Sequence, residues 1–155
     1  MFKAMRRKDR ELPREAANEI LNSGKYGVLS VVGEDGYPYG VPLHYVLIDG
    51  DAHFHSAAEG GHKTERFANK PKASFTVVET KNGIKARSAI VLGTIESLPD
   101  MRVAVLERLV EKFVPKFAWK PAKSGISTAQ DAIIAYQLKT EQVTAKFIDR
   151  PKKQK

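Results

Sequence analysis

The sequence predicts a mainly β fold, a six-stranded antiparallel β-barrel with helices covering it, and three observations lead to this prediction. Runs rich in β-branched and aromatic residues follow one another along most of the chain. Turns containing glycine, two of them Asp-Gly, separate the runs at the spacing of hairpins rather than of parallel crossovers. No linker, repeat or low-complexity stretch divides the 155 residues, so residues 1–155 are expected to form a single domain.

The composition is typical of a soluble globular protein, with 42% hydrophobic and 28% charged residues. Cysteine is absent, which excludes disulfides and thiolate metal sites. There is no apolar run near the roughly 20 residues that span a bilayer and no apolar leader at the N-terminus. We therefore expect a cytoplasmic protein that does not enter a membrane.

Basic residues exceed acidic ones, 26 to 18, for a net charge of +8. The local clusters lie in residues 1–13 and 150–155, which are expected to be a flexible arm and tail. Because no nucleic-acid recognition motif accompanies the charge, we expect no nucleic-acid binding. Steering of a phosphorylated ligand is the better interpretation of the positive field.

One helix and three strands are expected in the first third of the chain. The helix covers residues 14–22, with Pro13 suited to its first turn. The strands are expected at 26–32, 39–48 and 52–56, with Asp-Gly turns between them. Because Pro42 cannot donate to a strand ladder, the second of these strands is expected at an edge or a bulge.

The remainder of the chain is predicted to alternate helices and strands. We expect a helix at 62–70, strands at 72–80 and 84–98, a helix at 99–113 and a strand at 132–148. Gly93 inside the long strand predicts a bend. Residues 115–130 are rich in turn formers and are interpreted as a loop.

The stretch FHSAAEGGHK, from an expected strand end into an expected helix, has the residues of a phosphate site. Gly60 and Gly61 would let the backbone approach a ligand closely. Lys63 supplies a cation, Ser56 a hydroxyl, and His62 a further donor. The alternative is a strand–turn–helix junction in which the glycines only shape the turn, and the residues alone leave both interpretations open.

The histidines raise the question of a metal. His53 and His55 share one strand face with Asp51, a pattern compatible with joint ligation. Two ligands from one strand do not complete a site, so no metal centre is expected. There is also no GxSxG motif or paired-carboxylate arrangement, and an enzyme with this sequence would depend on a cofactor for its chemistry.

Two further features have open interpretations. Lys85 and Arg87 point to one face of the long strand and Ser88 to the other; Arg87 would reach an anion across an interface or face water. Trp119, the only tryptophan, would stack on a ligand ring or pack over the core edge.

These residues resemble the pyridoxamine 5′-phosphate oxidase-like family of FMN-binding split barrels, closest to the branch related to the nitroimidazole-resistance (Nim) proteins. The resemblance rests on the segments MRRKDREL, GVLSVVGEDGYPYGVPLHYV, FHSAAEGGHKTERFANKPKASFTVV and ARSAIVLGTIESL followed by a long helix. It covers about three quarters of the chain, in order and with natural spacing.

The resemblance implies a homodimer with FMN at its interface. It assigns the flavin phosphate to His55, Ser56, Ala57, His62 and Lys63, and the ring to the main chain of Val41, Pro42 and Leu43. It places Arg87 and Ser88 beside the cofactor, often from the other subunit. His55 matches a histidine near the flavin in the Nim branch, and we expect His55 and Trp119 beside the substrate.

The function implied is an FMN-dependent oxidoreductase that reduces a small organic acceptor, including nitroaromatics, with electrons from a nicotinamide donor. The alternative is a flavin-binding or haem-binding protein for storage or sensing without turnover. Pyridoxamine 5′-phosphate oxidation is disfavoured, because the strand YGVPLHYV lacks the arginine and lysine of those enzymes and their C-terminal Arg/His motif is missing. His62 stands where many relatives have a second basic residue.

Overall fold

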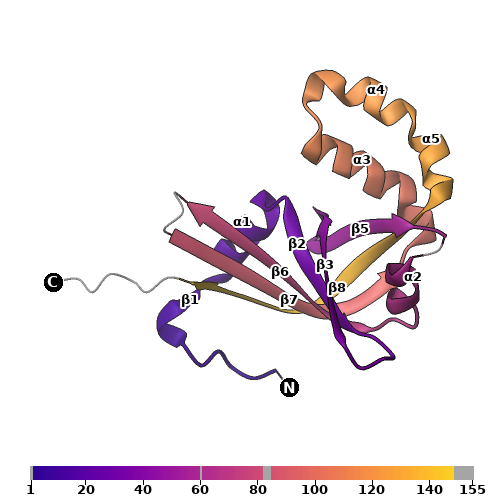
Figure 1. Cartoon of the computed structure of the whole chain (residues 1–155). Coiled ribbons are helices and arrows are strands. Elements are labelled where there is room, and N and C mark those ends of the chain that lie inside the picture. Colours follow the sequence, from indigo (N-terminus) through magenta and orange to yellow (C-terminus); the bar gives the residue numbers. More distant parts are fainter. Residues whose placement is uncertain (1, 60, 82–84, 149–155) are drawn as a thin grey trace.

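The computed structural model describes residues 2–59, 61–81 and 85–148, and its centre is one antiparallel sheet (Figure 1). The strands are β1 (Glu11–Leu12), β2 (Tyr26–Val32), β3 (Pro38–His44), β4 (Val46–Ile48), β5 (Asp51–Ala57), β6 (Lys72–Lys81), β7 (Lys85–Ser97) and β8 (Ile133–Phe147). They pair in the order β3-β2-β6-β7-β8-β5-β4, and β1 pairs with β8. Since β3 and β4 are consecutive in the chain yet stand at opposite ends of this order, the sheet curls into an incomplete barrel.

The predicted mainly β antiparallel fold is confirmed, with two additions to the six expected strands. β1 is a two-residue strand in the N-terminal segment, where Glu11 pairs with Lys146. The strand expected at 39–48 is two strands, β3 and β4, divided at Tyr45. At this point the chain changes its neighbouring strand. β3 pairs with β2 up to His44, which lies opposite Tyr26, and β4 pairs with β5 from Val46, which lies opposite His53.

Tyr45 is fully buried at this corner of the sheet, and its hydroxyl donates to the Leu21 carbonyl oxygen at 2.5 Å. Burial also raises the pKa of the phenol well above its ordinary value. A buried hydroxyl needs such a partner, so the bond fixes the point at which the chain changes neighbours.

The other sequence predictions about the sheet are confirmed. β3, which contains Pro42, stands at the end of the strand order, where a residue without an N–H is tolerated. The β7–β8 register shifts between Leu92 and Gly93. A Cβ at Gly93 would collide with the Lys139 carbonyl oxygen, so this irregularity needs a residue without a side chain.

Five α-helices and four short 3₁₀ turns accompany the sheet in the described residues. The helices are α1 (Arg14–Ser23), α2 (His62–Phe67), α3 (Arg102–Phe113), α4 (Trp119–Ser124) and α5 (Ile126–Ala129), and the 3₁₀ turns are η1 (Lys8–Arg10), η2 (Pro99–Met101), η3 (Lys116–Ala118) and η4 (Gln130–Ala132). The helices expected at 14–22, 62–70 and 99–113 are present within a few residues of their predicted bounds. None of the described helices has the length and apolar character to cross a membrane.

The interpretation of residues 115–130 as a loop is wrong, because they contain η3, α4 and α5. Pro121 is the third residue of α4, where a helix does not use the backbone N–H. Gly125 separates α4 from α5. Turn-forming residues therefore sit at the ends of short helices, and Figure 1 shows α3, α4 and α5 as a layer that stands out from the sheet over β5.

The core is divided unequally between the sheet and this helical layer. The main core lies inside the curled sheet, where Ile20 and Leu21 of α1 meet inward residues such as Leu29 and Phe75. A smaller cluster of Val46, Val105, Leu109 and Ala135 joins α3 to β4 and β8. The helical layer is thus attached through few buried side chains.

Candidate functional site

The residues of strand β5 that were predicted to bind the phosphate lie on opposite faces of the strand. Its burial alternates so that His55 and Ala57 point outward and are exposed, while Ser56 points inward and is 5% exposed. The Ser56 hydroxyl donates to the Ala57 carbonyl oxygen at 3.4 Å. The structure therefore keeps the side chain of Ser56 on the opposite side of the strand from His55.

Helix α2 begins at His62, a short connection after β5 ends at Ala57. Gly61 is extended at its N-cap, and Gly60, predicted to share its role, lies outside the described residues. Thr64 ties the helix to the strand by donating to the Ala57 carbonyl oxygen at 3.1 Å. The helix has only six residues, so its dipole is small, and any anion here depends mainly on side-chain cations.

The cation there is Lys63, and three histidines accompany it. Desolvation, followed by the positive Lys63 and then His44, lowers the pKa of His55. His62 is exposed and Lys63 partly buried, and within the described part of the chain neither forms an ion pair. We call His44, His55, His62 and Lys63 the basic cluster; it consists of one cation, Lys63, and three imidazoles, and no carboxylate pairs with Lys63 among the described residues.

The predicted ring-binding segment lies on the free edge of the sheet. In β3 the side chains of Val41 and Leu43 are buried and Pro42 is exposed. β3 has a strand neighbour only on its β2 side among the described residues, so half of its backbone donors and acceptors face outward. His44, at the end of this edge, belongs to the basic cluster. A planar heterocycle with a phosphate fits these residues: backbone groups for its polar edge and cations for its phosphate.

Arg87 and Ser88 lie elsewhere in the subunit. Arg87 donates through Nε to Glu79 at 2.6 Å and makes a longer contact of 3.5 Å with Glu19, and these carboxylates raise the pKa of its guanidinium. Ser88 is on the other face of β7 and is 4% exposed. Figure 1 shows the start of β7 and helix α2 at opposite ends of the sheet. Within this one chain, therefore, neither residue is brought to the basic cluster.

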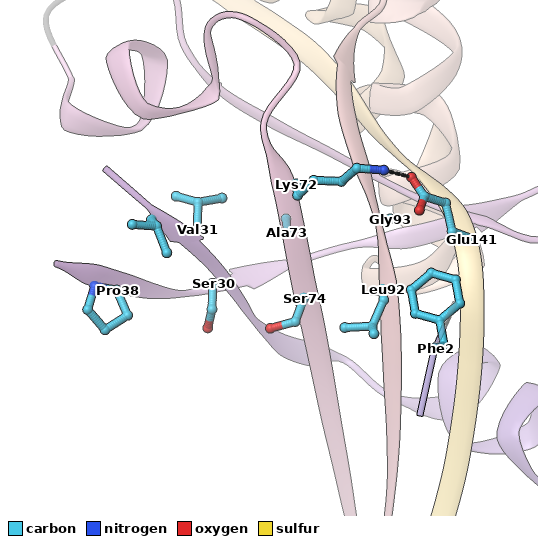
Figure 2. A pocket seen from close by; sticks show the side chains of 11 residues that line it. Phe2, Ser30, Val31, Pro38, Lys72, Ala73, Ser74, Leu92, Gly93 and Glu141 are labelled. Carbon is cyan, nitrogen blue, oxygen red and sulfur yellow. Dashed lines mark hydrogen bonds and ion pairs between the residues drawn. The ribbon is translucent and has the colours of Figure 1, made fainter. Parts of the chain in front are cut away.

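The outer face of the sheet carries two rows of uncharged residues. The strand registers align Pro42, Val28, Thr76, Ile90 and Thr144 in one row and Gly40, Ser30, Ser74, Leu92 and Gln142 in the next. We call these ten residues the uncharged face. A hollow of about 480 Å³ opens on it between β2 and β7, with Phe2 beside Leu92 and the Lys72–Glu141 ion pair at its rim (Figure 2).

A second hollow, of about 400 Å³, lies between the sheet and the helical layer. His44 and His55 reach it from the sheet, and helices α3 to α5 supply apolar side chains such as Leu106, Phe113 and Ile126. We call it the helical cavity. This cavity was not predicted, because residues 115–130, which form α4 and α5 in its wall, were interpreted as a loop. The apolar residues Ala122, Ile126 and Ala129, at helical spacing, could have indicated it.

Trp119 is not among the residues that line the helical cavity. Its indole Nε1 donates to the Val114 carbonyl oxygen at 2.8 Å, and Lys123 lies over its ring, 5.1 Å from the centroid. These contacts hold the turn between α3 and α4. No group of three or more potential metal-ligating side chains occurs in residues 2–59, 61–81 and 85–148.

An incomplete antiparallel barrel with a basic cluster beside a free edge strand defines a split-barrel protein of the pyridoxamine 5′-phosphate oxidase-like fold. A family model described as pyridoxamine 5′-phosphate oxidase matches residues 13–147. The chain belongs to this family. No match was found among curated proteins.

Solved structures share the fold over most of the chain. An FAD-binding protein from Mesorhizobium loti is 25% identical, with a TM-score of 0.68 over 90% of this chain and 98% of that one. A candidate 5-nitroimidazole antibiotic resistance protein from Bacteroides thetaiotaomicron is 18% identical, with a TM-score of 0.69 over 88% and 86%. An FAD and haem binding protein from Mycobacterium smegmatis is 18% identical, with a TM-score of 0.77 over 94% and 77%.

Proposed function

We propose that the protein binds FMN and is an FMN-dependent oxidoreductase that reduces a small organic acceptor with electrons from a nicotinamide donor. The observation that carries the proposal is the basic cluster: Lys63 without a paired carboxylate among the described residues, with three imidazoles, next to the free edge of β3. Family membership and the similarity to an FAD-binding protein support a flavin as the ligand.

In this proposal the chain binds and orients the cofactor. Lys63 and His62 hold the phosphate, with the backbone of Ala57 and Gly61 beside it. The main chain of Val41, Pro42 and Leu43 lies along the ring. The bound flavin would supply hydride and electron transfer. His55, with its lowered pKa, is a neutral donor and acceptor beside the reaction space.

The proposal includes a homodimer, because Arg87 and Ser88, two residues of the expected site, lie away from the rest of it within one chain. The uncharged face is a surface suited to a second copy, since interface centres are depleted of charge. Ser88 lies on that side of β7, next to Ile90. Docking there would bring the part of β7 that contains the buried Ser88 towards the partner's flavin. Arg87 would approach from the end of the sheet, still held by Glu79.

FMN is proposed rather than FAD because the cluster offers one phosphate site, built around Lys63. An FAD would need further room and donors for its second phosphate and adenine. We also propose a cytoplasmic location, where a nicotinamide donor is available. Nitroaromatic compounds are acceptors to test first, in view of the similarity to the nitroimidazole resistance protein.

The visible spectrum of the freshly purified protein tests the proposal, followed by mass analysis of the ligand that heating releases. We expect a flavin spectrum, released FMN, and bleaching when NADH or NADPH is added without oxygen. A flavin that no nicotinamide bleaches would refute the oxidoreductase and leave a flavin-binding protein. A haem spectrum, or a colourless protein that takes up no FMN, would refute the cofactor.

A further inference from the structure

We propose that the helical cavity is a binding site for an uncharged, planar aromatic molecule. Its role as the place where the acceptor meets the cofactor rests on the proposed function, but the binding itself does not. The proposal is carried by the shape of the cavity, by its aromatic edge and by the two imidazoles that face it.

The walls of the helical cavity are almost entirely apolar. Leu106, Leu109, Val110 and Phe113 of α3 form one side, and Ala122, Ile126 and Ala129 of α4 and α5 form another. No charged side chain lines it among the described residues. A charged ligand would lose its hydration there without a compensating partner, so the ligand that fits is uncharged.

An aromatic series crosses from the sheet to α3 at the edge of the cavity. The ring of His44 stacks on Phe113, with centroids 4.3 Å apart and an angle of 25°. On its other side His44 lies 4.5 Å from Tyr26 at a tilt of 46°. A further flat ring can extend such a series by offset or edge-to-face packing. This edge favours planar aromatic molecules over aliphatic ones of equal size.

The two imidazoles supply the polar contacts. Only His44 and His55 place ionisable groups at the cavity within the described chain. The lowered pKa of His55 favours its neutral ring, which has one donor and one acceptor nitrogen. A hydroxyl or carbonyl group on the ligand can pair with it. Few polar groups among apolar walls is the usual composition of a small-molecule site.

A small molecule fits better than a polypeptide segment. The hollow measures about 400 Å³, within the ordinary range of ligand pockets, roughly 300–1,000 Å³. It is concave on the sides of both the sheet and the helices, whereas the uncharged face offers a second subunit a broad sheet surface. It also opens next to the basic cluster through His55, which places an occupant near the proposed flavin ring.

Calorimetric titration of the purified protein with 2-naphthol, an uncharged fused-ring phenol, tests the site. We expect one molecule bound per chain. Replacing Ala129 with Phe fills the cavity from α5, and we expect affinity to fall by about tenfold or more, as for other steric changes in a fitted pocket. Thr128→Phe is the matched control, since both residues are exposed but only Ala129 lines the cavity; its affinity should equal wild type.

Ala122→Phe repeats the test from α4, so that a folding defect in one variant does not decide the result. Decahydro-2-naphthol, the saturated analogue, should bind at least about fivefold more weakly if ring stacking contributes as expected. The site would be overturned if 2-naphthol did not bind to wild type. It would also be overturned if both cavity-filling variants bound 2-naphthol as tightly as wild type does. Equal affinity for the saturated alcohol would overturn its aromatic specificity.

Flavin binding is measured on the same variants to separate this inference from the proposed function. Ala129→Phe and Thr128→Phe should retain wild-type FMN affinity, because residues 128 and 129 are outside the basic cluster and β3. Light scattering on Ala129→Phe completes the test. If that substitution changes the oligomeric state while 2-naphthol does not bind to wild type, a second copy fills the cavity and the proposal is wrong.

Discussion

The curled sheet and the helical layer are packed to different degrees, and the difference bears on function. Twenty buried residues form the main core of the described chain, including the aromatic pair Tyr45 and Phe75. Four form the cluster between α3 and the sheet. Interiors as well packed as the first are rigid, while regions with few buried contacts open at lower cost. The sheet is therefore the scaffold, and the helical layer is the less tightly packed wall of the helical cavity.

Paired truncations in the two regions should give the largest effect. Phe75 is 1% exposed and packs edge-on against Tyr45 at 4.8 Å. Phe75→Ala should lower the free energy of unfolding by about 3–5 kcal/mol, and Leu109→Ala in the helical layer by about 2 kcal/mol. Urea titrations at one fixed protein concentration measure both. Equal losses would mean that the two regions form one cooperative core and that the comparison fails.

The sheet half of this comparison was largely predictable from the sequence. The period-two pattern that buries Leu29 and Val31 gives the strands and their faces. The same alternation could have placed Ser56 inward, since Phe54 is an inward residue two positions before it. The register of the β6–β7 hairpin places Glu79 opposite Arg87, so their ion pair could also have been predicted from the sequence.

The helical half was not predictable in the same way. Prolines and glycines in residues 115–130 are equally typical of a loop and of short helices with defined ends. The corner at Tyr45 lies in an uninterrupted strand-like run, and only the long-range bond to Leu21 shows why the strand divides there. The cavity joins His44 and His55 to helical residues that begin with Leu106, 51 positions after His55, a proximity that no local pattern contains.

A charge on the uncharged face should have the second largest effect. Thr76 lies in the middle of its first row, between Val28 and Ile90. Thr76→Lys should convert the proposed dimer to a monomer, because a like charge would face its symmetry mate in a self-complementary interface. Thr128→Lys on α5 is the control and should leave the mass unchanged. A Thr76→Lys protein that remains dimeric by light scattering would show that another surface forms the dimer.

Removal of the central cation of the basic cluster comes next. Lys63→Ala should weaken FMN binding by about 1.5–3 kcal/mol, the contribution of a charge-assisted hydrogen bond. Fluorescence titration measures the affinity. Lys81→Ala removes an exposed lysine from the end of β6 and should leave the affinity within about twofold. If the two variants bind FMN alike, the phosphate is not at Lys63, although the scaffold could still bind a flavin elsewhere.

The smallest effect concerns the lysine that connects the two regions. Lys112 of α3 donates to the Tyr45 carbonyl oxygen at 3.0 Å, and its ammonium lies 4.0 Å from the centre of the Tyr45 ring. Both contacts favour the charged form. Burial nevertheless lowers the pKa of Lys112 from 10.5 to about 8. The helical layer is therefore held to the sheet at Tyr45 by the ammonium of Lys112, which has lost much of its hydration.

The stability of the protein should depend on this titration. Between pH 8 and 10.5 the unfolded chain keeps the proton that the folded Lys112 has released, so the free energy of unfolding should rise with pH across that interval. Below pH 8 the cost of the buried charge is present in full. Lys112→Met keeps the apolar stem and removes the ionisable group, and its stability should rise less with pH than that of wild type.

Subtracting the Lys112→Met curve from the wild-type curve, both from urea midpoints at successive pH values, isolates Lys112 from the other lysines. A difference that is flat through pH 8 to 10.5 would mean that the Tyr45 contacts fully compensate for the lost hydration. The helical layer would then be anchored as firmly as the sheet at this point, and its mobility would have to come from α4 and α5 alone.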